Sequence, residues 1–224
     1  DSMSVDVRAV ANCYTYYGEA VDKVYDEVAP TSSDYLATVT TEPLGVVAAV
    51  VPWNFPMLMA SWKVAPALAT GNSVVLKPAE QSSLSAIRLA ELALEAGVPE
   101  GVFNVVTGLG PDVGRALGMH MDVDGLFFTG STQVGKIFME YAAKSNLKKL
   151  GLELGGKSPN IILKSYRDTA HAARTSGNAA WFNQGEMCTC PSRLIVERPV
   201  FDEVLEVLKG VAKGFAPGDP LDPA

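Results

Sequence analysis

The sequence predicts an α/β protein in which helices cover both faces of a parallel β-sheet. Segments rich in β-branched residues alternate with amphipathic segments of about 10 to 16 residues, which indicates repeated β-α-β units. The run GVVAAVV, at residues 45–51, is apolar throughout, as in a parallel strand that is buried on both faces. In such sheets, ligands bind beside the carboxyl ends of the strands.

The first expected element is a helix over residues 4–28, where apolar and aromatic residues recur near the 3.6-residue period. Residues 35–41 alternate threonine with apolar residues and predict an exposed or edge strand, before the buried strand at 44–51. The later strands are expected at 72–78, 102–108, 125–130, 148–156, 158–163 and 192–197. The later helices are expected at 57–71, 82–97, 111–120, 131–146, 169–185 and 201–214. Ser82 or Ser83 is the expected N-cap of the helix that ends before Gly97.

Composition excludes several classes of protein. The net charge of -7 over 224 residues gives no basic surface for nucleic acid or an anionic membrane. No apolar run reaches the roughly 18 residues that span a bilayer, and no signal peptide is visible. Three cysteines do not form a disulfide framework, so a reducing, cytoplasmic location is expected. The start at Asp1 and the loop-like APGDPLDPA end lead us to expect that the chain is cut at both ends.

Two glycine-containing turns follow expected strands. In FFTGSTQVGK, at residues 127–136, backbone N–H groups at a helix start offer an anion site, with Gly130 and Gly135 allowing close approach. The segment TGLGPDVG, at residues 107–114, is a near match to a dinucleotide-binding fingerprint. Taken alone, both turns are equally compatible with a structural role.

Four polar residues at strand ends allow two interpretations at each of three sites. Lys77 and Glu80 either hold a ribose or form an exposed salt pair. Glu153, among leucines, is either a general base with a raised pKa or an acid that reaches solvent past the following glycines. Asn54, between two prolines, is either an oxyanion donor or a turn residue.

The cysteines favour a nucleophile or simple packing. A metal site needs about four ligands at suitable spacing, and neither His120 nor His171 provides such a spacing, so no metal is expected. A disulfide between Cys188 and Cys190, across one residue, would be strained.

Five motifs, in this order, resemble the NAD(P)-dependent aldehyde dehydrogenase superfamily: PWNFP, VLKPAEQ, FTGSTQVGK, LELGGKSPN and FNQGEMC. The resemblance covers the chain from about Tyr14 to its end. The stretches YGEAVDKVYDEVAPT and EPLGVVAAVVPWNFP are similar to bacterial γ-glutamyl-γ-aminobutyraldehyde and ω-aminoaldehyde dehydrogenases.

The resemblance implies that Cys188 is the nucleophile, that Asn54 and the Cys188 N–H hold the oxyanion, and that Glu153 activates the hydrolytic water. It implies an aldehyde substrate and NAD as cofactor, because a glutamate at position 80 repels the 2′-phosphate of NADP. The implied cofactor-binding residues are Val51, Pro52, Trp53, Lys77, Glu80, Gly110, Thr129, Gly130, Ser131, Gly135 and Leu154. Tyr16, Met57, Trp62, Phe182 and Met187 line an aldehyde tunnel or belong to the core.

The same resemblance implies a three-layer αβα, Rossmann-like cofactor domain over residues 1–154, incomplete at its N-terminus. Its segment at about 33–42 resembles a strand that packs between subunits, which implies a homo-oligomer. Residues 155–224 correspond to the first part of an α/β catalytic domain. Since the chain covers only the central part of the family's length, we expect it to be inactive alone.

Two adjacent positions depart from the family pattern. After the nucleophile, family members commonly have alanine and glycine, where this chain has Cys190 and Pro191. Two alternatives to a hydrolytic dehydrogenase remain: a catalytically silent or structural relative, and an enzyme that transfers the acyl group to coenzyme A.

Overall fold

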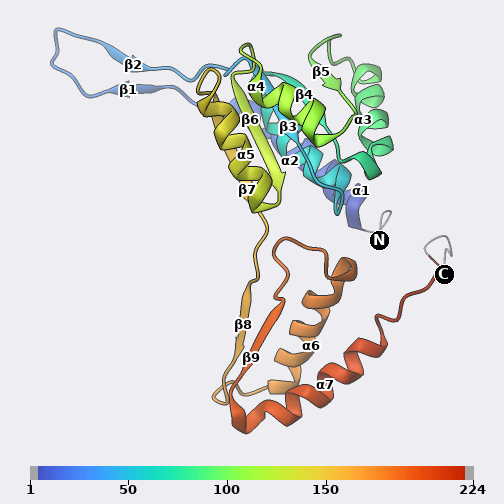
Figure 1. The fold of residues 1–224 in the computed structure, drawn as a ribbon. Helices are drawn as coiled ribbons and strands as arrows, with labels where there is room; N and C mark the ends of the chain where they lie inside the picture. The colour runs from blue at the N-terminus through green and yellow to red at the C-terminus, as the bar shows by residue number, and fades with distance from the viewer. Residues whose placement is uncertain (1–4, 220–224) are drawn as a thin grey trace. The chain divides into compact units, whose positions relative to one another are not determined.

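Figure 1 shows a computed structural model of the protein, in which residues 5–219 are described. The chain divides into two compact units, residues 1–154 and 155–224, and each unit is described by itself.

The first unit is built on a five-stranded parallel sheet with the strand order β5-β4-β3-β6-β7. Its strands are β3 (Val46–Val50), β4 (Ser73–Lys77), β5 (Phe103–Val105), β6 (Gly125–Gly130) and β7 (Lys149–Leu154). The predicted parallel α/β sheet is therefore confirmed. The chain runs outward from β3 to β5, then returns to the other side of β3 for β6 and β7.

Helices cover the two faces of this sheet. Alternate residues of β3 enter two separate cores, as expected for a strand with both faces buried. Ala49 packs with residues of α2 (Pro56–Ala69) and α3 (Leu84–Glu95). Ala48 packs with residues of α4 (Arg115–Met119) and α5 (Thr132–Ala143). This confirms the three-layer architecture. Within residues 5–219, no helix is long and apolar enough to cross a membrane.

The expected helix at 111–120 is divided. A single π-helical turn, η4 (Gly110–Gly114), precedes the short α4. At the start of α3, Ser83 occupies the cap position without a side-chain hydrogen bond, so the predicted serine cap is wrong in this respect. At the other end, Gly97 has φ +94° and the N–H of Val98 donates to the Ala93 carbonyl over 2.9 Å, a Schellman-type end.

The first helix is shorter than predicted. It spans α1 (Val7–Ala20) and passes through the 3₁₀ turn η2 (Val21–Lys23) into a β-hairpin. The hairpin pairs β1 (Glu27–Ala29) antiparallel with β2 (Ala37–Val39) and projects away from the body of the first unit (Figure 1). The helical period continued beyond Ala20 because Val21, Val24 and Tyr25 match it, although these residues lie in η2 and in the segment before β1. The expected strand at 35–41 is confirmed as an exposed strand.

The second unit has a two-stranded parallel sheet of β8 (Pro159–Ile162) and β9 (Arg193–Val196). Its helices are α6 (Thr169–Trp181) and α7 (Phe201–Lys213), and its 3₁₀ turns are η5 (Phe182–Gly185) and η6 (Arg198–Val200). The first unit contains a further 3₁₀ turn, η3 (Glu80–Ser82). Ile162, Ala173 and Val204 form its core. The neighbouring residues Ile161 and Ile195 are 60% and 50% exposed, so only one face of this sheet is covered within the unit.

Candidate active site

The carboxyl ends of β3 and β6 lie at the point where the strand order reverses. β4 lies on one side of β3 and β6 on the other, and ligands of open α/β sheets bind at such a switch point. Val51, Pro52, Trp53 and Asn54 follow β3 directly, and Ser131 follows β6. The topology therefore brings the sequence-predicted residues of these two loops to the same edge of the sheet.

The loop after β3 turns into α2 at Pro56. Val51 is buried and its N–H donates to the Lys77 carbonyl over 3.1 Å, which extends the contact between β3 and β4 past the end of the strand. Trp53 is 44% exposed, and Asn54 is half-buried. The loop thus presents one indole to solvent and keeps one amide close to the sheet.

Lys77 and Glu80 form an ion pair with an unequal burial. Lys77 is 3% exposed, and its Nζ lies 3.3 Å from Glu80 Oε1. The same carboxylate oxygen accepts the N–H of Gly110 over 2.8 Å, which joins the loops after β4 and β5. A hydrogen bond from its own backbone N–H lowers the pKa of the Glu80 carboxyl, and Lys77 and Gly110 lower it further against the opposing effect of burial. Glu80 is therefore held ionised at the edge where the ribose was predicted.

The β6–α5 turn has the expected helix start. The Ser131 hydroxyl caps α5 by accepting the N–H of Val134 over 3.3 Å. A Cβ at Gly135 would lie 2.7 Å from the Leu154 side chain, so this glycine lets α5 pack directly on β7. A Cβ at Gly130 would lie 2.4 Å from the Phe128 ring. Gly130 and Gly135 therefore both allow a neighbouring side chain to pack closely against the backbone.

Glu153 is exposed on β7, as in the interpretation of an acid that reaches solvent, and its role as a general base stays a prediction. β7 is the edge strand of the five-stranded sheet and, among the described strands, pairs only with β6. Glu153 lines a groove of about 980 Å³, to which α1 and α2 contribute Tyr16 and Trp62.

Lys63 was missed by the sequence analysis. Its Nζ donates to the Thr129 hydroxyl over 2.6 Å, and Thr129 pairs in register with Glu153 across β6 and β7. Lys63 also lines the groove that contains Glu153. The available signal was that Lys63 is the only charged residue in the apolar stretch that forms α2.

In the second unit, Cys188 lies at the corner of a tight turn and is exposed. The N–H of Cys190 donates to the Met187 carbonyl over 3.1 Å and closes this turn. Asn183 and Gln184, at φ +48° and +53°, and then Gly185, at φ +75°, are all left-handed. This costs about 1–2 kcal/mol for each residue with a side chain. The predicted helix at 169–185 therefore ends at Trp181, and the backbone reverses before Cys188.

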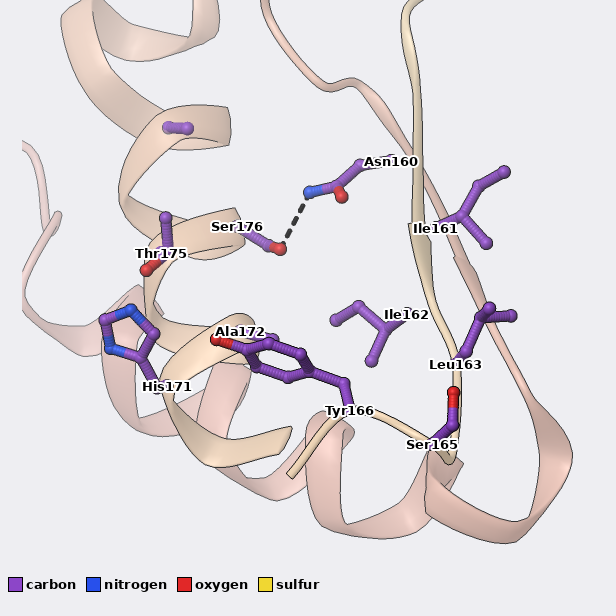
Figure 2. A pocket seen from close by; sticks show the side chains of 11 residues that line it. Asn160, Ile161, Ile162, Leu163, Ser165, Tyr166, His171, Ala172, Thr175 and Ser176 are labelled. Carbon is purple, nitrogen blue, oxygen red and sulfur yellow. Dashed lines mark hydrogen bonds between the residues drawn. The ribbon is translucent and has the colours of Figure 1, made fainter. Parts of the chain in front are cut away.

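His120 belongs to the first unit and His171 to the second. His120 Nδ1 accepts the N–H of Asp122, while His171 lines a cavity of about 560 Å³ between β8 and α6 (Figure 2). In that cavity the Asn160 amide donates to the Ser176 hydroxyl over 2.7 Å. Among residues 5–219 there is no group of three or more histidine, cysteine, aspartate or glutamate residues that could hold a metal ion.

Comparison with protein families gives one match over the whole length. The sequence model described as the aldehyde dehydrogenase family matches residues 1–224. The NADP/NAD-dependent aldehyde dehydrogenase PuuC of Escherichia coli (strain K12) is 52% identical over 223 residues, covering 100% of this chain and 45% of that protein. The aminoacetaldehyde dehydrogenase of Pseudomonas aeruginosa is 49% identical, covering 97% of this chain and 44% of that protein.

Solved structures give the same result. A γ-glutamyl-γ-aminobutyraldehyde dehydrogenase from Burkholderia cenocepacia matches with a TM-score of 0.97 and 57% identity, over 100% of this chain and 45% of that one. An indole-3-acetaldehyde dehydrogenase in complex with NAD⁺ matches with a TM-score of 0.98 and 55% identity, with the same coverage. The chain thus spans less than half the length of the relatives it matches.

Proposed function

Because this chain belongs to the aldehyde dehydrogenase family, we propose that its protein oxidises an aldehyde to a carboxylate with NAD as the hydride acceptor. The observation that carries the proposal is the exposed Cys188 thiol, at the corner of a closed turn that follows a left-handed backbone segment. Since the chain spans about 45% of its relatives' length, the proposal concerns the complete protein.

Cys188 is the proposed nucleophile. Its thiolate attacks the aldehyde carbon and forms a thiohemiacetal, while the carbonyl oxygen gains negative charge. The Asn54 amide and the Cys188 backbone N–H are the proposed donors to this oxygen. Losing one such donor typically lowers the rate by about 10² to 10³. The proposed chemistry thus uses Asn54 and Glu153 of the first unit and Cys188 of the second.

The cofactor is proposed to occupy the carboxyl edge of the first unit's sheet, where its nicotinamide supplies the hydride acceptor. The residues present suit a dinucleotide. The N–H groups at the start of α5, capped by Ser131, favour a pyrophosphate at the point where the strand order reverses. The ionised Glu80 carboxylate is suited to accept ribose hydroxyls and to repel a 2′-phosphate, which favours NAD over NADP. The other residues in this role are Val51, Pro52, Trp53, Lys77, Gly110, Thr129, Gly130, Gly135 and Leu154.

Glu153 is the proposed general base for the second half of the reaction. After hydride loss the acyl group remains on Cys188 as a thioester, and a water molecule must lose a proton to attack it. A carboxylate with access to water is required for this step, and Glu153 is exposed in the groove of the first unit. Its presence favours hydrolysis over acyl transfer to coenzyme A.

The proposed substrate is a small aldehyde that carries an amino or amide group. Two of the relatives described above are named for aminoacetaldehyde and γ-glutamyl-γ-aminobutyraldehyde. The groove beside Glu153 combines the aromatic side chains of Tyr16, Tyr17 and Trp62 with the Glu42 carboxylate. Aromatic faces and a carboxylate together suit a cationic terminus.

We also propose a homo-oligomer in the cytoplasm. The β1–β2 hairpin exposes apolar side chains such as Val28 and Leu36, which are 70% and 81% exposed, and these favour burial against a second subunit. Cys13, Cys188 and Cys190 are all free thiols, which suits a reducing compartment.

The test is NADH formation by the complete protein with aminoacetaldehyde, γ-glutamyl-γ-aminobutyraldehyde and indole-3-acetaldehyde, with and without coenzyme A. We expect oxidation without coenzyme A, highest kcat/KM for the two nitrogen-containing aliphatic substrates, and a loss of at least about 10⁴-fold in Cys188→Ala. Cys13→Ala is the matched control and keeps its activity. Full activity in Cys188→Ala would remove the nucleophile assignment, and dependence on coenzyme A would favour the acylating alternative.

A further inference from the structure

The segment between α6 and β9 carries Cys188 and is fixed from within the second unit. It leaves α6 after Trp181, reverses through left-handed residues, turns at Cys188 and enters β9 at Arg193. Its one buried thiol belongs to Cys190, which is 7% exposed, whereas the Cys188 thiol two residues earlier is exposed.

Cys190 binds the end of α6 through its side chain. Its thiol donates to the Ala180 carbonyl, with Sγ 3.2 Å from the oxygen. Ala180 lies in the last turn of α6, where carbonyl groups have no partner inside the helix and need one from elsewhere. A Cβ at Gly185 would lie 3.1 Å from the same oxygen, so the left-handed segment packs against this carbonyl as well.

The backbone of Cys190 holds the turn itself. Its N–H donates to the Met187 carbonyl over 3.1 Å, which places Cys188 and Thr189 at the two corners. Its carbonyl accepts the N–H of Ser192 over 2.8 Å, which makes a three-residue turn centred on Pro191. The φ that proline imposes is close to the value at the centre of an inverse γ-turn. The turn therefore does not need the backbone N–H that Pro191 lacks.

We propose that Cys190 is a positioning residue for Cys188, and that it acts by tying the Cys188 turn to the Ala180 carbonyl at the end of α6. Pro191 supports it by restricting the chain directly after the tie. The inference rests on the proposed function, because it assigns Cys190 a task in presenting the nucleophile. It also gives a reason for the two residues that depart from the family pattern. The Cys190 side chain and the Pro191 ring both stiffen the loop that carries Cys188.

The decisive experiment compares Cys190→Ser, Cys190→Ala and Cys190→Val in the complete protein. Serine keeps a hydrogen-bond donor, valine keeps an apolar side chain of similar size, and alanine keeps neither. We expect kcat to fall roughly tenfold in the alanine and valine variants, because a displaced reacting group slows the chemical step. The serine variant should stay within about threefold of the unchanged protein, because the hydrogen bond is retained. KM should change by less than about twofold in all three.

Thermal unfolding separates positioning from packing. If Cys190 only fills space, kcat and Tm follow side-chain size, so that valine is best and serine resembles alanine. That outcome, or an unchanged kcat in Cys190→Ala, would overturn the proposal. Activity in Cys188→Ala would instead overturn the proposed function, and the two failures are thus distinct.

A second measurement needs no turnover. Iodoacetamide applied to the folded complete protein, with each cysteine followed by mass spectrometry of its peptide, should alkylate Cys188 at least about tenfold faster than Cys190, because only the former thiol is accessible. In Cys190→Ser, Cys188 should be labelled at the unchanged rate. Equal labelling of both cysteines in the folded protein would contradict the buried tie on which the inference depends.

Discussion

The two units hold their functional residues in different ways. In the first unit, a five-stranded sheet with two cores fixes the carboxyl edge, so that Glu80 and Ser131 are positioned by neighbouring strands and helices. In the second unit, the two-stranded sheet has one small core, and Cys188 is positioned by turns. The proposed cofactor surface can thus be read from topology, whereas the proposed nucleophile depends on local hydrogen bonds that only a few side chains provide.

Apart from the loss expected in Cys188→Ala, the largest expected effect tests whether the two units serve different steps. Glu153→Gln removes the proposed base of the first unit and leaves Cys188 in place. The first burst of NADH should persist, while steady-state turnover should fall by about 10² to 10⁴, as for a lost general base. Stopped-flow absorbance of the complete protein measures both.

Glu95→Gln is the control, because Glu95 is an exposed carboxylate of α3 that pairs with Arg88 and does not line the groove. It should leave steady-state turnover nearly unchanged. An unchanged steady state in Glu153→Gln would take Glu153 out of the thioester hydrolysis, and loss of the burst would mean that it acts earlier.

A smaller effect tests the contrast in packing. Leu76 is fully buried in the first unit, and Leu76→Ala should lower the free energy of unfolding by about 2–5 kcal/mol. Ile195 is 50% exposed in the second unit, and Ile195→Ala should lower it by less than about 1 kcal/mol. Hydrogen exchange of the isolated chain, followed separately in peptides of each unit, measures both. An equal cost at the two sites would show that the Ile195 face is covered in solution.

The smallest effect concerns Glu80, which is 42% exposed, so that solvent screens its interactions. Because its pKa is lowered in the folded chain, its stabilising contribution is present above the ordinary carboxyl pKa of about 4.3 and is lost as the pH falls through the lower folded value. The urea midpoint of Glu80→Gln should therefore lie below that of the unchanged chain at about pH 7, and the difference should shrink towards about pH 3.

Glu140→Gln serves as the comparison, since the ion pair of Glu140 with Lys144 has two exposed members. It should shift the midpoint less at neutral pH. If the Glu80→Gln difference grew on acidification, the assignment of Glu80 as a stabilised carboxylate would be wrong.

The fold was predictable because its signals are repeated. Apolar runs and helical periods alternate through the first unit, and the continuous run at residues 45–51 identified its central strand. The end of α1 was not predictable in the same way. Tyr25 and Val28 continue the helical period by coincidence, and only the pairing of Val28 with Thr38 in β1–β2 fixes the strand conformation of Val28.

The residues of the candidate site also divide into those whose position the sequence predicted and those whose position it did not. Residues directly after strands, such as Val51 and Ser131, are placed by topology alone. The exposure of Glu153 depends on β7 being the last strand of the sheet, and the bond from Lys63 to Thr129 depends on the direction of one side chain. The tie between Cys190 and Ala180 depends on where α6 ends, and sequence periodicity overestimated that helix by one turn.

The position of β3 in the middle of its sheet has a consequence for the order in which the polypeptide assembles. As the chain leaves the ribosome, Val50 can pair at once with Lys77 of β4, but its second partner, Phe128 of β6, is synthesised much later. Until then one edge of an apolar strand carries unpaired backbone groups, which is a template for pairing with another nascent chain. We therefore expect the interval between the synthesis of β4 and β6 to be the period in which this protein is most prone to aggregation and most dependent on chaperones.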